Sequence, residues 1–220
     1  MVAYAKTVVM SQRIRLHRFL CFAALIFIPI FLFSAGYLLR VNSAKPSDLI
    51  LVLASEDNQS TVNKGLELIE HGYGNLILID DNADVRVYGF IRTDMAEEFA
   101  HQVSGHAAGR VHVCRVEGDS QLAETKYVRA CLSRLSVQSV LLITHDFESR
   151  RAQMTFNRTL PRYSWSVAPV EDPDEFGVKW WQHREWAKNT VTEWLRLTWW
   201  VAIDSWQTSR DAASASNKPL

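Results

Sequence analysis

The sequence lacks the short motifs that identify the commonest nucleotide-binding and hydrolytic sites. It contains no P-loop, no G-x-S-x-G and no H-E-x-x-H. The loop after its first predicted strand has no glycine, so the backbone there cannot approach a pyrophosphate as it does in dinucleotide-binding folds. His101, His106 and His112 lack metal-ligand spacing, and we interpret them as surface residues. These absences leave the chain outside the motif-defined enzyme classes.

Negative charge is missing from the N-terminal part of the chain. Residues 1–39 contain four basic side chains and no acidic one, although the whole chain has 24 of each kind. The remainder therefore carries 20 basic and 24 acidic residues, which is a slight acidic excess. A nucleic-acid-binding surface needs a basic face, so we expect no nucleic-acid partner.

Cysteine is scarce, and the three residues form no C-x-x-C pair, which argues against a zinc site. Cys21 falls in an apolar run near the N-terminus. Cys114 and Cys131 can form one disulfide in an oxidising compartment. Buried free thiols are the interpretation that the sequence favours.

The longest apolar run, Phe19 to Leu39, carries no charge. As a helix, about 21 residues extend about 31 Å, which matches a hydrocarbon core of about 30 Å, and Pro29 is tolerated in a membrane helix. A cleaved signal peptide is the alternative, but its apolar region is usually only about 7–15 residues long. We therefore predict an uncleaved transmembrane anchor. The basic residues before it predict a cytoplasmic N-terminus and a domain outside the inner membrane.

After the anchor, short apolar strands alternate with amphipathic helices. This alternation predicts an α/β domain with a mainly parallel sheet and right-handed crossovers. Helices are expected around Val62–Ile69, over Met95–Val103, after a cap at Asp119 or Ser120, and from Phe147 to about Leu160. The predicted strands are Asp48–Ala54, Asn75–Ile79, Arg110–Val116, Val140–Ile143 and Tyr163–Val170.

Tryptophan is concentrated at the C-terminal end, where seven of the eight lie between Lys179 and Trp206. Apolar residues recur there at helical spacing, which predicts a terminal helix packed on the domain. A sharper alternative places some of the rings at the bilayer interface. Residues 208–220 are rich in Ser and Ala and are expected to be a disordered tail.

The stretch Val140 to Ala152 is the best candidate for a ligand site. A buried strand there passes directly into a helix, and open α/β sheets bind their ligands at such positions. The N-terminus of a helix favours an anion, and Arg150 and Arg151 in its first turn add donors for phosphate or carboxylate. A simple turn with two surface-paired arginines is the alternative.

Polar side chains also follow the other strands, and we expect them to converge on one edge of the sheet. Many acids at one edge can bind a divalent cation or act as general acid and base. Any single one is more often a helix cap or turn residue. They are Ser55, Glu56, Asp57, Asp80, Asp81, Asn82, Glu117, Asp119, Ser120, Thr144, His145, Asp146 and Glu148.

Several segments resemble the bacterial SanA/ElyC/YdcF-like family of envelope proteins, a domain of unknown function. They are D-L-I-L-V-L, E-G-D-S-Q-L-A-E, V-L-L-I-T-H-D-F-E-S-R-R-A-Q-M-T-F and the late W-W-Q-H-R-E and E-W-L-R-L. The resemblance covers about Asp48 to Leu197. It implies a Rossmann-like three-layer α/β/α domain, often preceded by one transmembrane helix. Family members are implicated in envelope integrity and in lipid-carrier or peptidoglycan metabolism, and S-adenosylmethionine binding is ascribed to one relative.

The family's pattern is only partly kept. Glu117, Ser120, Thr144, Arg151 and Ala152 match it. The glycines usual after the first two strands are absent, and Leu122-Ala123 replaces an Asn-Thr pair. The family's histidine ahead of the Arg-Ala pair is Glu148 here, and an ionised glutamate only accepts hydrogen bonds.

Together these features predict a divergent family member acting in envelope maintenance. Its expected parts are a cytoplasmic N-terminus (1–18), a transmembrane anchor (19–39), a tether (40–47), the α/β domain (48–207) and the tail (208–220). As an enzyme it would be a hydrolase or transferase acting on an anionic lipid-linked or peptidoglycan precursor. The alternative is a non-catalytic ligand-binding or protein-interaction domain. No particular cofactor or metal is predicted.

The predicted site divides its residues by role. Proton transfer is assigned to Glu148 and Glu117. Anion binding by arginine is assigned to Arg150 and Arg151. The remaining substrate-binding residues are Ser55, Asp80, Ser120 and Thr144.

Overall fold

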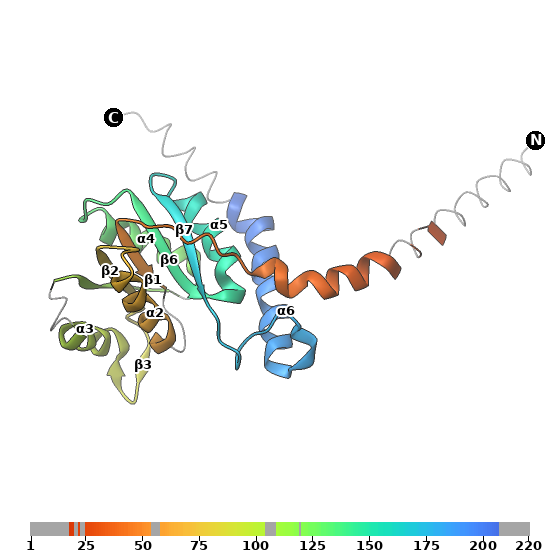
Figure 1. The fold of residues 1–220 in the computed structure, drawn as a ribbon, viewed down its shortest axis with the longest axis horizontal. Helices are drawn as coiled ribbons and strands as arrows, with labels where there is room; N and C mark the ends of the chain where they lie inside the picture. The colour runs from red at the N-terminus through yellow and green to blue at the C-terminus, as the bar shows by residue number, and fades with distance from the viewer. Residues whose placement is uncertain are drawn as a thin grey trace, which may run out of the picture.

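The computed structural model describes residues 18–19, 22, 25–53, 58–103, 109–118 and 120–206. Its centre is a five-stranded sheet in the order β5-β2-β1-β6-β7, in which every neighbouring pair is parallel. Figure 1 shows this sheet with helices packed on both of its faces. The strands are β1 (Leu49–Val52), β2 (Leu76–Asn82), β5 (Val111–Val116), β6 (Ser139–His145) and β7 (Ser164–Val170).

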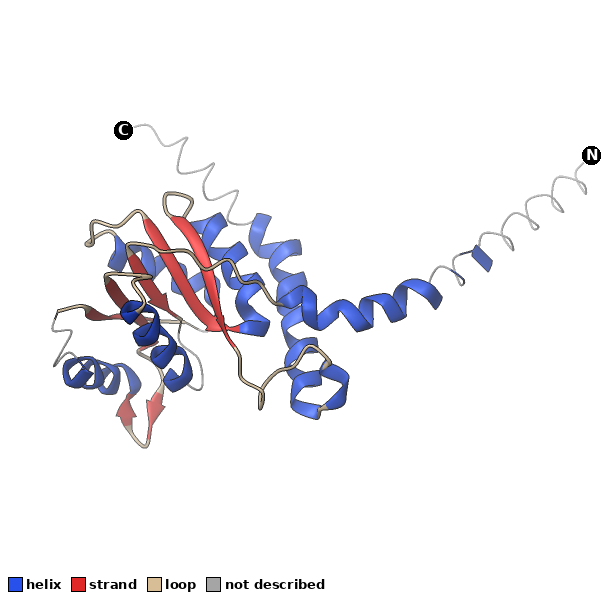
Figure 2. Cartoon of the chain, viewed as in Figure 1, coloured by secondary structure: helices blue, strands red, loops and turns tan. Residues whose placement is uncertain are grey.

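The helices cover the sheet because its central strands are apolar on both faces. In β1, Leu49 and Leu51 face one core, and Ile50 and Val52 face the other, as the two-residue period of a strand requires. The first core is covered by α4 (Gln121–Leu132) and α5 (Ser149–Thr159). The second is covered by α2 (Asn58–Glu70) and α3 (Arg92–Val103). The predicted three-layer α/β arrangement with a parallel sheet is thus confirmed (Figure 2).

The order of the strands creates a switch point between β1 and β6. From β1 the chain moves outward through β2 to β5, then returns across the sheet to β6 and continues to β7. Ligands of open α/β sheets bind at the carboxyl ends of the strands at such a point, because the flanking connections diverge there. The stretch predicted to carry the site, Val140 to Ala152, begins in one of the two strands at this switch.

Two strands are longer than predicted. β2 continues through Asp80 and Asp81 to Asn82, and β6 continues through Thr144 to His145. Both extensions follow from strand pairing, which uses backbone groups and does not depend on apolar side chains: Asp80 pairs with Cys114 of β5, and the end of β6 pairs with β7. The aspartates of β2 therefore lie within the sheet, not after it.

A small hairpin was not predicted. β3 (Arg86–Val87) and β4 (Phe90–Ile91) are antiparallel and are joined by Tyr88 and Gly89, both with positive φ. Such two-residue turns usually begin with Asn, Asp or Gly, so a tyrosine in that place concealed the signal.

The tryptophan-rich segment forms α6 (Arg184–Trp199), preceded by the short helix η2 (Trp180–Gln182) and followed by the π-helical turn η3 (Trp200–Asp204). The predicted terminal helix is confirmed. Both α6 and η2 contact the helix at residues 25–39. Trp194 Nε1 of α6 donates to Ala35 O at 3.3 Å, and Trp180 Nε1 of η2 donates to Leu32 O at 2.9 Å. The structure does not test the alternative that some tryptophan rings lie at the bilayer interface. Leu195, Trp199 and Trp206 are exposed.

The helix at residues 25–39 projects from the domain, and most of its large apolar side chains are exposed (Figure 1). Its last residue, Leu39, is buried, and Arg150 Nε donates to Leu38 O. Within the part of the chain that the structure describes, no helix has both the length and the apolar character needed to cross a membrane. The predicted anchor also includes residues 20–21 and 23–24, which lie outside the described residues. Residues 1–17 of the predicted cytoplasmic N-terminus and the predicted tail, 208–220, lie outside them too.

The predicted tether lies along the edge of the sheet. Ser43 N donates to Val167 O at 2.9 Å, and Ser43 Oγ accepts from Val167 N at 3.1 Å. Ser43 therefore binds this segment to β7.

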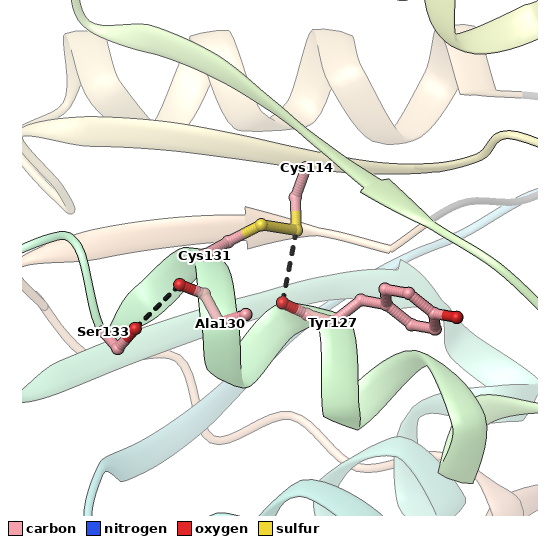
Figure 3. Close-up of a disulfide and its surroundings, with 5 residues drawn as sticks. All are labelled: Cys114, Tyr127, Ala130, Cys131 and Ser133. Carbon is pink, nitrogen blue, oxygen red and sulfur yellow. Dashed lines mark hydrogen bonds between the residues drawn. A yellow bond between two sulfur atoms is a disulfide. The ribbon is translucent and has the colours of Figure 1, made fainter.

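The favoured interpretation of the cysteines as free thiols is wrong. Cys114 of β5 and Cys131 of α4 form a disulfide, with their Cα atoms 6.1 Å apart (Figure 3). α4 follows β5 directly and packs against it, which brings the two residues within the usual range for a disulfide. Cys114 Sγ also lies 3.7 Å from Tyr127 O. The bridge closes the segment that connects β5 to α4.

Candidate functional site

Two adjoining cavities lie at the carboxyl edge of the sheet, between its strand ends and α6. Their volumes are about 640 and 610 Å³, and Glu124, Glu148 and Arg196 line both. We call the two cavities together the edge cleft. One end is bordered by Leu53, just after β1, and the other by His145 at the end of β6. The edge cleft therefore opens at the switch point, where the fold favours a ligand.

Glu148 lies at the centre of the edge cleft. It ends the short helix η1 (Asp146–Glu148), which connects β6 to α5. Glu148 Oε1 accepts from Arg196 Nη1 at 3.2 Å and from Arg151 Nη2 at 3.5 Å. Its side chain is 20% exposed, so solvent and ligand can reach the carboxylate.

Glu124 faces the same space from the first turn of α4. Ser120 caps this helix, with its Oγ accepting from Ala123 N at 3.3 Å, as the sequence predicted. Burial raises the pKa of Glu124 to about 7, and the negative charge of Glu148 adds to the effect. Near neutral pH, Glu124 is therefore divided between its protonated and ionised forms.

A buried ion pair, Arg151 and Glu193, lies beneath the edge cleft and contacts Glu148. Arg151 Nε donates to Glu193 Oε1 at 2.5 Å, and Arg151 Nη2 donates to Glu193 Oε2 at 3.1 Å. The side chains of Arg151 and Glu193 are 11% and 1% exposed. Burial raises the pKa of Glu193 to about 7, and its attraction to Arg151 opposes a further rise. Arg151 Nη1 also donates to Gln121 Oε1 at 3.0 Å, so the guanidinium connects α4, α5 and α6.

This arrangement suits proton transfer. Two carboxyl groups that share a cleft, one of them with a pKa raised by burial, can act as a general acid and a general base. Arg196 is 55% exposed at the rim of the edge cleft, where it can contact an anion. The far end contains Lys188, which is 69% exposed.

Of the eight residues that the sequence analysis assigned a role in the site, three line the edge cleft: Ser120, Glu148 and Arg151. Asn82 and His145, from the wider set of polar residues, line its second cavity. Two others of the eight, Asp80 and Thr144, are buried inside β2 and β6. These two belong to strands that are longer than predicted, so their side chains lie within the sheet layers.

The remaining predicted residues lie elsewhere. Glu117 follows β5, where Tyr127 Oη donates to its Oε2 at 2.8 Å, and it does not line either cavity. Arg150 faces the helix at 25–39 and donates to Leu38 O. Ser55, with Glu56 and Asp57, lies outside the described residues.

The predicted anion position at the start of the helix after β6 is taken by a side chain of the protein. Asp146 Oδ1 accepts from Phe147 N at 2.9 Å, so the aspartate itself provides the negative group. Burial raises the pKa of Asp146 to about 7. The start of this helix is therefore a weaker binding position for an external anion than the sequence predicted.

Sequence reasoning missed Glu124, Glu193 and Arg196. Glu193 had a detectable signal, because it shares the buried face of α6 with Thr190 and Leu197 at helical spacing. A glutamate on such a face is unusual and indicates a buried partner. Glu124 had no such signal in the sequence, because a glutamate in the first turn of a helix is ordinarily a solvent-facing residue.

The comparisons with known proteins give this chain no family. No protein-family model matches it, and no curated protein matches it significantly. The resemblance to SanA/ElyC/YdcF-like proteins therefore stays a prediction, and the site is interpreted from its own chemistry.

Proposed function

We propose that this protein is a membrane-anchored envelope protein that binds an anionic precursor in the edge cleft and acts on it by proton transfer. The observation that carries the proposal is the pair Glu124 and Glu148 in a cleft at the switch point of a parallel sheet. Both residues are reachable from the cleft, and the charge of Glu148 favours the protonated form of Glu124.

The two glutamates divide the chemistry between them. Glu124, whose pKa is raised to about 7 by burial, donates its proton to the leaving group when protonated. Glu148 accepts a proton from the attacking water or hydroxyl. The reaction class is hydrolysis or group transfer on a phosphate- or sugar-containing precursor.

Arginine at the rim supports an anionic ligand. Arg196 contacts Glu148 through one nitrogen and is more than half exposed, so it has donors left for a phosphate or carboxylate. Arg151 has the internal task of holding Glu193, Gln121 and Glu148 in place. We therefore propose Arg196 as the ligand-binding arginine and Arg151 as the residue that positions Glu148.

Two features support the location outside the inner membrane. The Cys114–Cys131 disulfide is typical of an oxidising compartment. The exposed apolar side chains of the helix at 25–39, such as Phe27 and Phe33, fit a helix that continues into a bilayer.

One observation favours a second candidate function, ligand or partner binding without catalysis. The guanidinium of Arg151, which matches the family's pattern, is occupied by three side chains of the protein itself. A site whose arginine is occupied by side chains of the protein itself can bind a ligand without catalysing a reaction. Turnover separates this candidate from the first.

The test is turnover of phosphorylated lipid-linked precursors by the full-length chain in detergent. Glu124→Gln and Glu148→Gln each keep the shape of the side chain and should reduce the rate by about 100-fold or more. Glu97→Gln, on the exposed side of α3, is the matched control and should leave the rate unchanged. Equal rates in all variants would refute the assignment of both glutamates. Precursor binding without any turnover would support the second candidate.

A further inference from the structure

We propose that His145, Asp172 and Glu175 form a binding site for one divalent metal ion, and that Zn²⁺ fits the donor set best. His145 ends β6, and the two carboxylates lie in the loop after β7. One ligand atom from each side chain lies within 4.8 Å of the other two. His145 Nδ1 lies 3.5 Å from Glu175 Oε2.

The histidine provides a second, independent observation. His145 is 3% exposed, and neither ring nitrogen makes a hydrogen bond to any residue that the structure describes. A buried polar group without a hydrogen bond is destabilising. Coordination through Nδ1, the nitrogen nearest to Glu175, would satisfy that atom.

The spacing suits a metal ion. With bonds of about 2.0–2.1 Å, the ligand atoms of a tetrahedral Zn²⁺ site lie about 3.3 Å apart. The 3.5 Å between His145 and Glu175 is close to this value. Both acidic residues are only partly buried, so rotation of a carboxylate can close the remaining separation.

The loop that supplies the carboxylates is held in shape before any ion binds. Asp172 Oδ1 accepts from Asp174 N at 2.9 Å, which orients the carboxylate and leaves its other oxygen for a metal. Phe176 N donates to Asp172 O at 2.9 Å, and Phe176 is buried. The loop is thus a closed turn with an apolar anchor.

Helix α6 fixes the same turn from outside. Asn189 Nδ2 donates to Glu175 O at 2.9 Å, and Trp186 Nε1 donates to Pro173 O at 2.9 Å. These bonds give the late tryptophan-rich segment a role that its sequence did not suggest. They position the two carboxylates against the end of β6.

The proposed ion would face the edge cleft. His145 and Glu175 line the cavity that also contains Glu148 and Arg196. Three protein ligands leave one position of a tetrahedral ion open, as in catalytic zinc sites. The ion would add positive charge to a region rich in carboxylates, which favours an anionic ligand. Metal binding itself does not depend on the proposed proton transfer.

The test is titration of the full-length chain with Zn²⁺ alone, after removal of metals with a chelator and without a polyhistidine tag. Calorimetry gives the number of sites and the affinity, and Co²⁺ in place of Zn²⁺ gives a visible spectrum that reports the ligand set. Asp172→Asn and Glu175→Gln should each weaken binding by about 100-fold or more. Asp174→Asn, in the same turn but outside the cluster, is the matched control and should bind like the unchanged chain.

One ion per chain, lost in both ligand variants and kept in the control, is the expected result. His145→Gln keeps a polar side chain at the buried position and should also lose the ion. The proposal is overturned if the chain binds no Zn²⁺ or Co²⁺, or if all variants bind it equally. Because this measurement needs no substrate, failure of metal binding and failure of the proposed turnover are separate outcomes.

Discussion

Among the described residues, two arginine-centred ion-pair networks differ sharply in exposure. In the first, Arg151 bonds Glu193 and Glu148 beneath the edge cleft, with side chains 11%, 1% and 20% exposed. In the second, on α3 and β5, Arg115 bonds Asp94 at 2.8 Å and Glu97 at 3.0 Å, with side chains 48%, 55% and 43% exposed. The charges are the same in kind, so the contrast lies in their surroundings.

The difference in burial bears on which network serves the proposed function. Exposed ion pairs contribute only about 0–1 kcal/mol, and water replaces them readily. A buried pair requires desolvation of both charges, and apolar residues of similar size often stabilise a protein as well or better. Arg151 and Glu193 are therefore poorly explained by stability alone. Their position beneath the edge cleft accounts for them, since Arg151 binds Glu148 as well as Glu193 and so holds the Glu148 carboxylate in place.

Breaking the buried pair should have the largest effect. Glu193→Leu leaves the Arg151 guanidinium buried without its main partner, and the free energy of unfolding should fall by about 3–5 kcal/mol. Chemical denaturation measures the change. Arg115→Ala in the exposed network is the comparison and should change stability by less than about 1 kcal/mol.

Replacing both members of the buried pair sharpens the comparison. Arg151→Met with Glu193→Leu should recover most of the stability lost in Glu193→Leu, because no unpaired charge remains. The double variant should still lose turnover. If stability stays low in the double variant, the pair is needed for folding, and the contrast between the networks loses its functional meaning.

The disulfide should have the next largest effect. It spans 17 positions and encloses Ser120 and Glu124, so it restrains the segment that carries one glutamate of the cleft. Replacing Cys114 and Cys131 with serine should lower the free energy of unfolding by about 3 kcal/mol. Adding reductant to the unchanged chain should reproduce the loss. Rapid alkylation of both cysteines in the unreduced, folded chain would contradict the bridge.

The smallest of the three effects is a pH dependence of stability. Burial raises the pKa of Glu124 from its ordinary 4.5 to about 7, so the folded state holds a proton that the unfolded state has released. The free energy of unfolding should therefore fall by about 1–3 kcal/mol as pH rises from about 4.5 to 7, and this contribution should then level off. Denaturation curves at pH 5 and 8 should differ less for Glu124→Gln. Equal differences in both proteins would show that Glu124 is not the group.

The order and type of the strands and helices could be predicted from the sequence because they depend on local patterns. Unbroken apolar runs such as Val140–Ile143 mark strands buried on both faces, and Ser120 before an amphipathic stretch marks a helix start. The parallel sheet follows from their alternation with helices. These features need no knowledge of distant contacts.

The site could be read only in part because its chemistry depends on distant contacts. Glu148 was identified from its place after a strand, but Glu124 and Glu193 gain their raised pKa from packing between α4, α5 and α6. Arg150 and Arg151 are neighbours in sequence, yet the helix turns one toward residues 25–39 and the other toward the edge cleft. The sequence alone does not show in which direction each of the two side chains points from the helix.

The measurement that tests the central claim most directly is ligand-dependent thermal stability of the full-length chain with phosphorylated envelope precursors. A precursor at about 100 times its dissociation constant should stabilise the fold by about 2.7 kcal/mol. The account predicts that Arg196→Gln, at the rim of the edge cleft, loses this stabilisation and that Arg115→Gln, in the exposed network, keeps it. Stabilisation retained in Arg196→Gln, or absent with every precursor, would contradict the edge cleft as the binding site.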